Sequence, residues 1–272
     1  MKFRTAIRIM SFMILGGLIL PIAFSCKERT SKAPELTNKS IQQDIKEYAY
    51  PVHSVFDITN MLIQIDASYV IGITNNPLNV EKYFSDQSKA YNLGIYTADL
   101  AYATTYNEKA EVQNYFNASE KLITDLSLAS ALSSDLPEQI EENIDNKEKL
   151  VEIITKVTQD AYSYLNNQGR AELAYLILAG SVIEGLYLTC HLSESTYQNP
   201  EIVKTILYQK EPLQKLQALM ESGNIELTQP VLNDIKKINA IFAEAEEPAS
   251  LTIQQVDQLT GLLSQIREKN NQ

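Results

Sequence analysis

Residues 173–192 read LAYLILAGSVIEGLYLTCHL, the most apolar run beyond the N-terminal segment, with Glu184 as its only formal charge. A carboxylate at the centre of a membrane span would cost several kcal/mol, which argues against a transmembrane helix. A helix that is apolar on nearly every side belongs in the middle of a soluble bundle, with other helices packed around it. We therefore predict an all-α fold, a multi-helix bundle around a central apolar helix at residues 170–192.

The rest of the sequence supports long helices joined by short turns. Only nine Gly and nine Pro occur in 272 residues, and no segment alternates strictly between polar and apolar residues, so we expect essentially no sheet. Helical periodicity predicts about eight main helices, one of them over residues 54–73. Asn107 and the run 166–169 should end helices, and Pro212 should kink or split the helix that begins at Pro200.

The N-terminus has the layout of a secretory signal peptide. Residues 1–8 carry three positive charges, residues 9–22 are apolar, and Ala23 and Ser25 supply small residues at a cleavage site. The apolar run is short for a conventional membrane span, although a retained N-terminal anchor is an alternative reading.

Cys26 directly follows Ser25, and this arrangement resembles the lipobox of bacterial lipoproteins. The resemblance implies that Cys26 is diacylated, with palmitate among its acyl chains, and becomes the mature N-terminus. Ala23 stands where lipoboxes usually have Leu, and Phe24 is bulky for its place. Ala23 and Ser25 also satisfy the ordinary small-x-small rule, so cleavage without lipidation is the alternative.

These signals predict three parts: a signal peptide (1–25), a lipidated cysteine with a polar tether (26–40) and an all-helical domain (41–272). The Tyr- and Asn-rich body resembles uncharacterised helical lipoproteins of Bacteroidetes-type bacteria. The resemblance implies attachment to the outer membrane of a bacterial cell envelope, facing the periplasm or the cell surface, and a protein partner in the envelope. Two or more acyl chains make such an anchor stable.

The net charge of −11 weighs against nucleic acid as a partner. The charged residues of the signal segment are all basic, namely Lys2, Arg4 and Arg8, so its removal leaves a net charge of about −14. A chain this acidic repels phosphate backbones. The simplest interpretation of the charge is a solvated acidic surface.

Two carboxylates, Asp99 and Glu184, fall in helices that look buried, so each needs a partner or a raised pKa. If the two helices are neighbours, an acidic, Tyr-lined pocket for a small molecule or cation could form between them. Its residues would be Asp99, Tyr102, Tyr106, Glu184, Tyr187 and His191. The alternative is a pair of structural carboxylates bonded to Tyr hydroxyls, to Lys89 or Arg170, or to helix N-termini.

Both helices carry one short common pattern: GIYTADLAY from Gly94 and GSVIEGLY from Gly180. Each places an acid four or five residues after the Gly and a Tyr three residues beyond the acid. Duplication of a helix pair would produce this echo, and so would chance.

No motif predicts catalysis, a metal site or a cofactor. The chain has two His, His53 and His191, and contains neither the Glu-x-x-His pair of di-iron bundles nor a Gly-rich phosphate loop. Cys190 and His191 are adjacent, so on a helix they point about 100° apart. The sequence therefore favours a non-catalytic binding or scaffolding role. The alternative is a small-molecule or cation-binding protein, with an enzyme included, that uses the Asp99 and Glu184 pocket.

Overall fold

The computed structural model describes residues 56, 58–61, 63–64, 67–191, 199–245 and 250–270. The signal segment, Cys26 and the tether lie outside the described residues. From residue 67 on, the described part contains nine α-helices and two short 3-10 helices, and eight of the α-helices have nine or more residues, in line with the predicted number of about eight. The helices are α3 (Asp86–Thr105), α4 (Lys109–Asp125), α5 (Leu136–Glu142), α6 (Lys147–Asn167), α7 (Ala171–His191), α8 (Pro200–Tyr208), α9 (Lys210–Ser222), α10 (Ile225–Ala243) and α11 (Ile253–Asn270). The 3-10 helices are η1 (Pro77–Lys82) and η2 (Ala129–Ala131).

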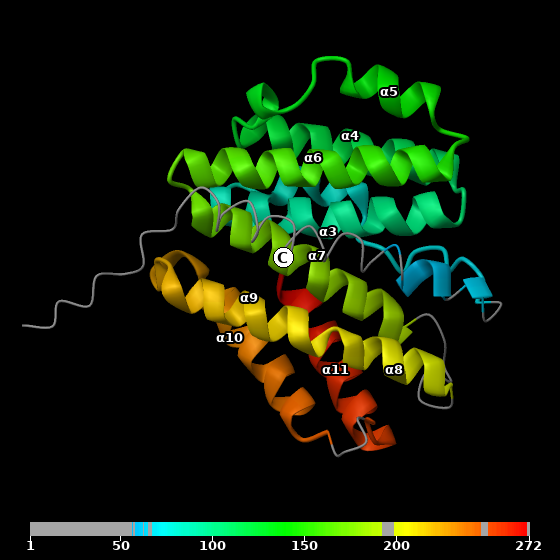
Figure 1. Ribbon diagram of the computed structural model, residues 1–272, viewed down its shortest axis with the longest axis vertical. Helices are drawn as coiled ribbons and strands as arrows, with labels where there is room; N and C mark the ends of the chain where they lie inside the picture. Colours follow the sequence, from blue (N-terminus) through cyan, green and yellow to red (C-terminus); the bar gives the residue numbers. More distant parts are fainter. Residues whose placement is uncertain are drawn as a thin grey trace, which may run out of the picture. The chain divides into compact units, whose positions relative to one another are not determined.

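Helix α7 is the predicted central helix and is buried along almost its whole length. It packs against α3, α6, α8, α9, α10 and α11. Helices α3, α4, α5 and α6 lie on one side of it, and α8 to α11 lie on the other (Figure 1). Within the described residues, α7 is the one helix long and apolar enough to cross a membrane. Its enclosure by six other helices explains that composition as the core of a bundle.

The contact between α3 and α7 is the most extensive in the described bundle and has a steric cause. A Cβ atom added to Gly94 would lie 1.9 Å from the backbone oxygen of Ile177. One added to Gly180 would lie 2.0 Å from the backbone oxygen of Tyr91. The two backbones therefore touch, and only glycine fits at the crossing. The shared sequence pattern thus marks the point where the two helices meet.

The predicted turn residues end helices for identifiable reasons. Asn107 follows α3 with φ 58°, and Gly169 separates α6 from α7 with φ 70°, a left-handed conformation that Asn and Gly adopt most readily. Pro212 lies three residues into α9 and has no N–H to donate to Tyr208. The predicted helix from Pro200 is accordingly split at Gln209 into α8 and α9.

One predicted helix is too long. The described residues between 56 and 64 are helical, as expected for the helix at 54–73, but residues 67–76 form an irregular segment. Tyrosine hydroxyls from the end of α3 and from its C-cap residue replace the helical hydrogen bonds there. Val70 N–H donates to the Tyr102 hydroxyl at 2.9 Å, and the Tyr106 hydroxyl donates to the Ala67 oxygen at 3.0 Å. Because α3 supplies these partners, the segment needs no helical bonds of its own.

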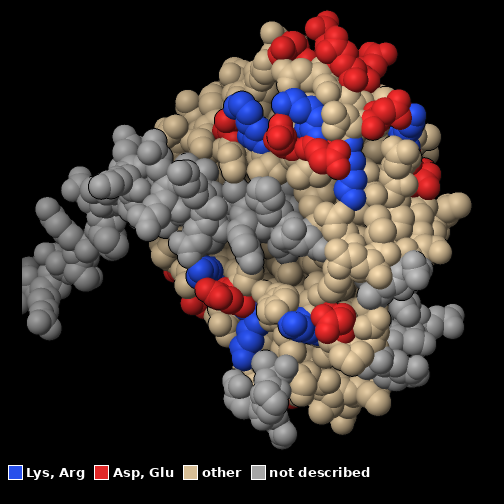
Figure 2. Space-filling model, turned by 45° about the vertical axis from the view of Figure 1, so that its right-hand side comes forward, with Lys and Arg blue, Asp and Glu red and all other residues tan. Residues whose placement is uncertain are grey.

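The charged surface is mixed in sign on the face that Figure 2 shows. Acidic side chains gather at the top of this view, the end where α5 lies in Figure 1, and below them basic and acidic side chains are interleaved. Many of the ion pairs are exposed, for example Lys149 with Glu152 and Lys156 with Asp160. Such pairs contribute little to stability and keep the surface solvated.

Candidate functional site

Asp99 and Glu184 meet inside the bundle, as the pocket hypothesis requires. Their exposed fractions are 0% and 2%, and the two carboxyls are close enough for each to affect the pKa of the other. The Asn75 N–H donates to Asp99 Oδ2 at 3.1 Å. Asp99 Oδ1 is buried and forms no hydrogen bond with a described residue. Helices α3 and α7 run in the same direction past the crossing of Gly94 and Gly180. Asp99 lies five residues after Gly94, and Glu184 lies four residues after Gly180, so the two acids come together.

The cation that neutralises these acids comes from the last helix. Arg267 of α11 places Nη1 3.0 Å from Glu184 Oε1, and its side chain is 10% exposed. The sequence interpretation that named Lys89 or Arg170 as the partner is wrong. Lys89 pairs with an aspartate of α4 at 3.2 Å, and Arg170 pairs with an aspartate at the start of α3 at 3.1 Å. Both stay near the surface, since helix ends fix their positions, whereas Arg267 projects into the core.

The surroundings raise the pKa of both carboxyls, with different causes for each. Burial raises the pKa of Asp99 well above its usual value, and the negative charge of Glu184 raises it further against the opposing charge of Arg267. Burial also raises the pKa of Glu184, but the Arg267 guanidinium acts against this rise. One proton on the Asp99 and Glu184 pair, together with the positive charge of Arg267, makes the cluster neutral, which is the state that a dry interior tolerates.

Tyr187 and His191 continue this cluster along the contact between α7 and α11. The guanidinium carbon of Arg267 lies 4.0 Å from the centre of the Tyr187 ring, and that ring stacks on His191 at 3.9 Å. One ring nitrogen of His191 faces the Ser264 hydroxyl at 2.9 Å, and the other faces the Tyr187 backbone oxygen at 2.8 Å. Burial lowers the pKa of His191, the hydrogen bond with the Tyr187 oxygen raises it, and the Arg267 charge lowers it further; the net shift is downward, which favours the neutral imidazole.

Tyr102 and Tyr106 belong to a different group. Their hydroxyls form hydrogen bonds with the backbone of Val70 and Ala67. The Tyr69 ring packs against both of their rings, with its centre 4.9 Å from that of Tyr102 and 5.7 Å from that of Tyr106. The six predicted pocket residues are therefore divided between two places. Four of them form the buried cluster with Arg267, and two hold the irregular segment against α3.

Sequence reasoning missed Arg267, although a signal was present. Arg267 lies four residues after Leu263 and eleven after Val256, two buried residues of α11. It therefore stands on the apolar face of that helix, where an unpaired cation is costly. A cation on an apolar stripe predicts a buried acid as its partner, and Glu184 was the candidate in the most apolar helix.

Cys190 is enclosed between α7 and α11. Burial raises the pKa of its thiol to about 12, against a hydrogen bond with Thr260 that lowers it. The thiol is therefore protonated and unreactive at neutral pH. Among the described residues, no three His, Cys, Asp or Glu side chains gather in a group that could hold a metal ion.

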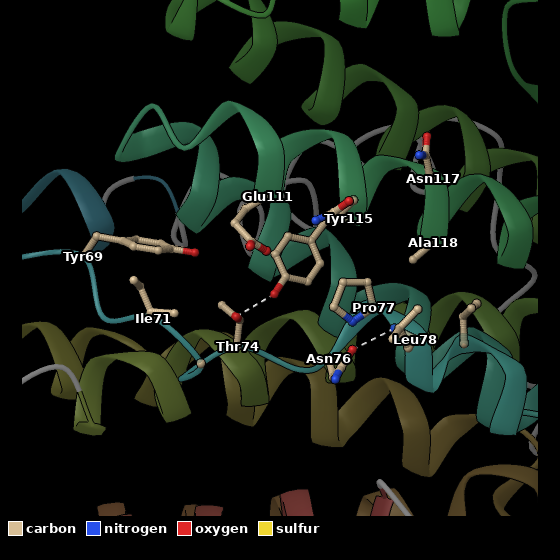
Figure 3. Close-up of a pocket in the computed structure, with 13 residues that line it drawn as sticks. Tyr69, Ile71, Thr74, Asn76, Pro77, Leu78, Glu111, Tyr115, Asn117 and Ala118 are labelled. Atoms are coloured by element: carbon tan, nitrogen blue, oxygen red, sulfur yellow. Dashed lines mark hydrogen bonds between the residues drawn. The ribbon is translucent and has the colours of Figure 1, made fainter.

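A second candidate site is an open groove at the surface, with a volume of about 700 Å³. It lies between the irregular segment with η1 and one face of α4 (Figure 3). Its lining residues are Tyr69, Ile71, Gly72, Thr74, Asn76, Pro77, Leu78, Val80, Glu111, Asn114, Tyr115, Asn117 and Ala118. Asp99 and Glu184 are not among them. The sequence analysis did not identify this groove, because it depends on the irregular course of residues 67–76.

The groove combines apolar rims with a polar floor. Ile71 and Leu78 are 89% and 79% exposed, which is unusual for large apolar side chains. Figure 3 shows Glu111 and Tyr115 extending from α4 toward Thr74, whose hydroxyl accepts a hydrogen bond from Tyr115 at 2.5 Å. The arrangement places one carboxylate beside aromatic rings in a concave surface.

Comparisons with known proteins identified no relative of this chain. No family model, no curated protein and no solved structure matches the chain.

Proposed function

We propose that this chain is a lipid-anchored protein of a bacterial cell envelope with a non-catalytic binding or scaffolding role. The N-terminal layout of charged segment, apolar segment and Cys26 supports the anchor. A protein held at a membrane by acyl chains on a flexible tether presents its folded domain to partners in the adjoining compartment.

The observation that carries the non-catalytic role is the state of the buried acids. Acid–base catalysis needs a carboxyl that a substrate can reach and whose proton it can exchange. Asp99 and Glu184 are instead enclosed, and the positive charge of Arg267 lies against them. A cation or substrate entering this cluster would have to displace the guanidinium, so the geometry favours a structural role for both acids.

The anchor is tested by metabolic labelling with radioactive palmitate in a bacterial host. We expect the wild-type chain to be labelled and to sediment with the membranes, and Cys26→Ala to be unlabelled. Globomycin, which blocks the lipoprotein signal peptidase, should cause the unprocessed precursor to accumulate for the wild-type chain only. A wild-type chain that is cleaved normally without label, or that ignores globomycin, would refute the lipid anchor.

A further inference from the structure

We propose that the groove between residues 69–80 and α4 binds a cationic, partly apolar ligand, with an amine or guanidinium group at Glu111. This proposal rests on the binding role proposed above and names the chemistry of the ligand. The volume of about 700 Å³ falls within the range of about 300–1,000 Å³ that is typical of ligand pockets.

The first support is the charge of the lining. Glu111 is half-buried in the groove and forms no salt bridge with any described residue, and no Lys or Arg is among the lining residues described. The charges of Glu111 and Glu108 add to burial in raising the pKa of the Tyr69 hydroxyl. This end of the groove is therefore negative without a cation of its own, and the approach of a ligand cation is favourable.

The second support is the position of the rings. Tyr69 and Tyr115 both line the groove that holds Glu111, and Figure 3 shows Tyr69 across from Tyr115 with the carboxylate between them. An ammonium or guanidinium group is attracted both by a carboxylate and by an aromatic ring within about 6 Å. Tyr115 is only 1% exposed and offers no open ring face, so the partly exposed Tyr69 ring and the Glu111 carboxylate are the groups that suit a cation.

The third support is the apolar rim. Ile71 and Leu78 project at the groove, and Phe84, just beyond η1, is 85% exposed. These are the three most exposed large apolar side chains in the described residues, and they fall within fourteen residues of one another. An alkyl chain attached to the cation would cover part of this surface, which gives the ligand its amphiphilic character. The Asn76 and Asn117 amide oxygens accept hydrogen bonds from the Leu78 N–H and Gln113, so their NH₂ groups and the Asn114 amide are the hydrogen-bonding groups for its polar parts.

The test is titration of the full mature protein, purified in detergent, with hexylamine and with hexanol, its neutral counterpart of equal length. Calorimetry or NMR should detect saturable binding of the amine that weakens as salt is added, and at least about tenfold weaker binding of the alcohol. A blocked peptide containing one Lys, compared with the same peptide containing norleucine, separates a peptide side chain from a free amine as the source. Tighter binding of the Lys peptide than of hexylamine assigns the groove to peptides, and the reverse assigns it to small amines.

The matched variants are Glu111→Gln and Glu120→Gln. Glu120 is exposed on the same helix, nine residues after Glu111 and therefore about 180° around the helix axis. Glu120→Gln thus removes the same charge as Glu111→Gln, but on the opposite face of α4. We expect Glu111→Gln to weaken amine binding about tenfold or more and Glu120→Gln to leave it within about twofold. Equal effects of the two variants, or equal binding of amine and alcohol, would overturn the proposal. Either result leaves the palmitate labelling of Cys26 unaffected, so the ligand and the anchor are judged separately.

Discussion

Arg267 is the residue on which the buried charges depend. It stands on the apolar face of α11 and forms the ion pair with Glu184 while lying over the Tyr187 ring. Buried ion pairs are costly to build, but removing one partner is worse because the other charge stays in the interior. Loss of the Arg267 side chain should therefore destabilise the whole fold.

We expect Arg267→Met to reduce the free energy of unfolding by about 3–5 kcal/mol, because Glu184 would keep an uncompensated charge in the core. Urea unfolding followed by circular dichroism measures the change. The double variant Arg267→Met with Glu184→Gln should regain more than half of the loss. Lys156→Met removes a cation from an exposed pair and serves as the control, with little change expected. An Arg267→Met protein no less stable than the control would contradict the ion-pair assignment.

Asp99 makes the stability depend on pH. Its folded-state pKa is raised above the value of an unfolded chain, so folding takes up a proton once the pH exceeds the unfolded value of about 4. The stability of the wild-type protein therefore falls, through this group, as the pH rises from about 4 toward the folded pKa. The proton belongs to the Asp99 and Glu184 pair as a whole.

Asp99→Asn replaces the neutral acid by a neutral amide and removes this dependence. We expect the stability of Asp99→Asn relative to wild type to improve steadily between pH 4.5 and pH 7.5 in urea unfolding. Asp160→Asn, at an exposed position on α6, should show no such trend. If the difference in free energy of unfolding between Asp99→Asn and wild type stayed constant with pH, or if wild type gained stability relative to the variant as the pH rose, Asp99 would be ionised in the folded protein.

At the scale of elements, the crossing of α3 and α7 organises the bundle. Gly94 and Gly180 let the two backbones touch, and this contact sets the registration that brings the acids together. The echo between the two helices was visible in the sequence, but its meaning as a contact was not. Glycine at a helix interior costs about 1 kcal/mol of helix propensity, and here that cost is offset by close packing.

Gly180→Ala should destabilise the protein by about 3 kcal/mol, because its Cβ would meet the backbone oxygen of Tyr91, which cannot rotate away as a side chain can. Thermal or urea unfolding measures the loss. Gly261→Ala in α11 is the matched control, since nothing lies within 4 Å of a Cβ built there. That control should gain up to about 1 kcal/mol from better helix propensity. If both alanine variants behaved alike, the close crossing would be refuted.

The irregular segment shows why helix boundaries were the weaker part of the prediction. Residues 54–73 carry a helical stripe, yet the chain leaves the helix before Ala67, and Gly72 has φ 81°. Tyr102 and Tyr106 satisfy the backbone of this segment from 32 and 39 residues away. A local pattern holds no information about such distant partners. Pro212, by contrast, acts through its own missing N–H, and its splitting of the helix was predictable.

At the scale of the whole molecule, α7 joins two groups of helices that the chain forms one after the other. Asp99 comes from the first group, Glu184 from α7 itself and Arg267 from the second group. The neutral cluster therefore ties distant parts of the sequence together at one point of the core. Asp99 and Glu184 do not line the groove, but the irregular segment connects the two sites, because Asn75, between the lining residues Thr74 and Asn76, donates its N–H to Asp99.

By itself the sequence determined the all-helical class, the central helix, the turn residues at Asn107 and Gly169, and the two acids in the core. These features follow from periodicity, composition and local backbone preference, which are properties of neighbouring residues. Only the tertiary structure decided that Arg267 neutralises the acids, that Tyr102 and Tyr106 support a loop, and that Glu111 stands in a groove. Those features depend on which helix faces reach one another, and that is fixed by packing across the whole chain.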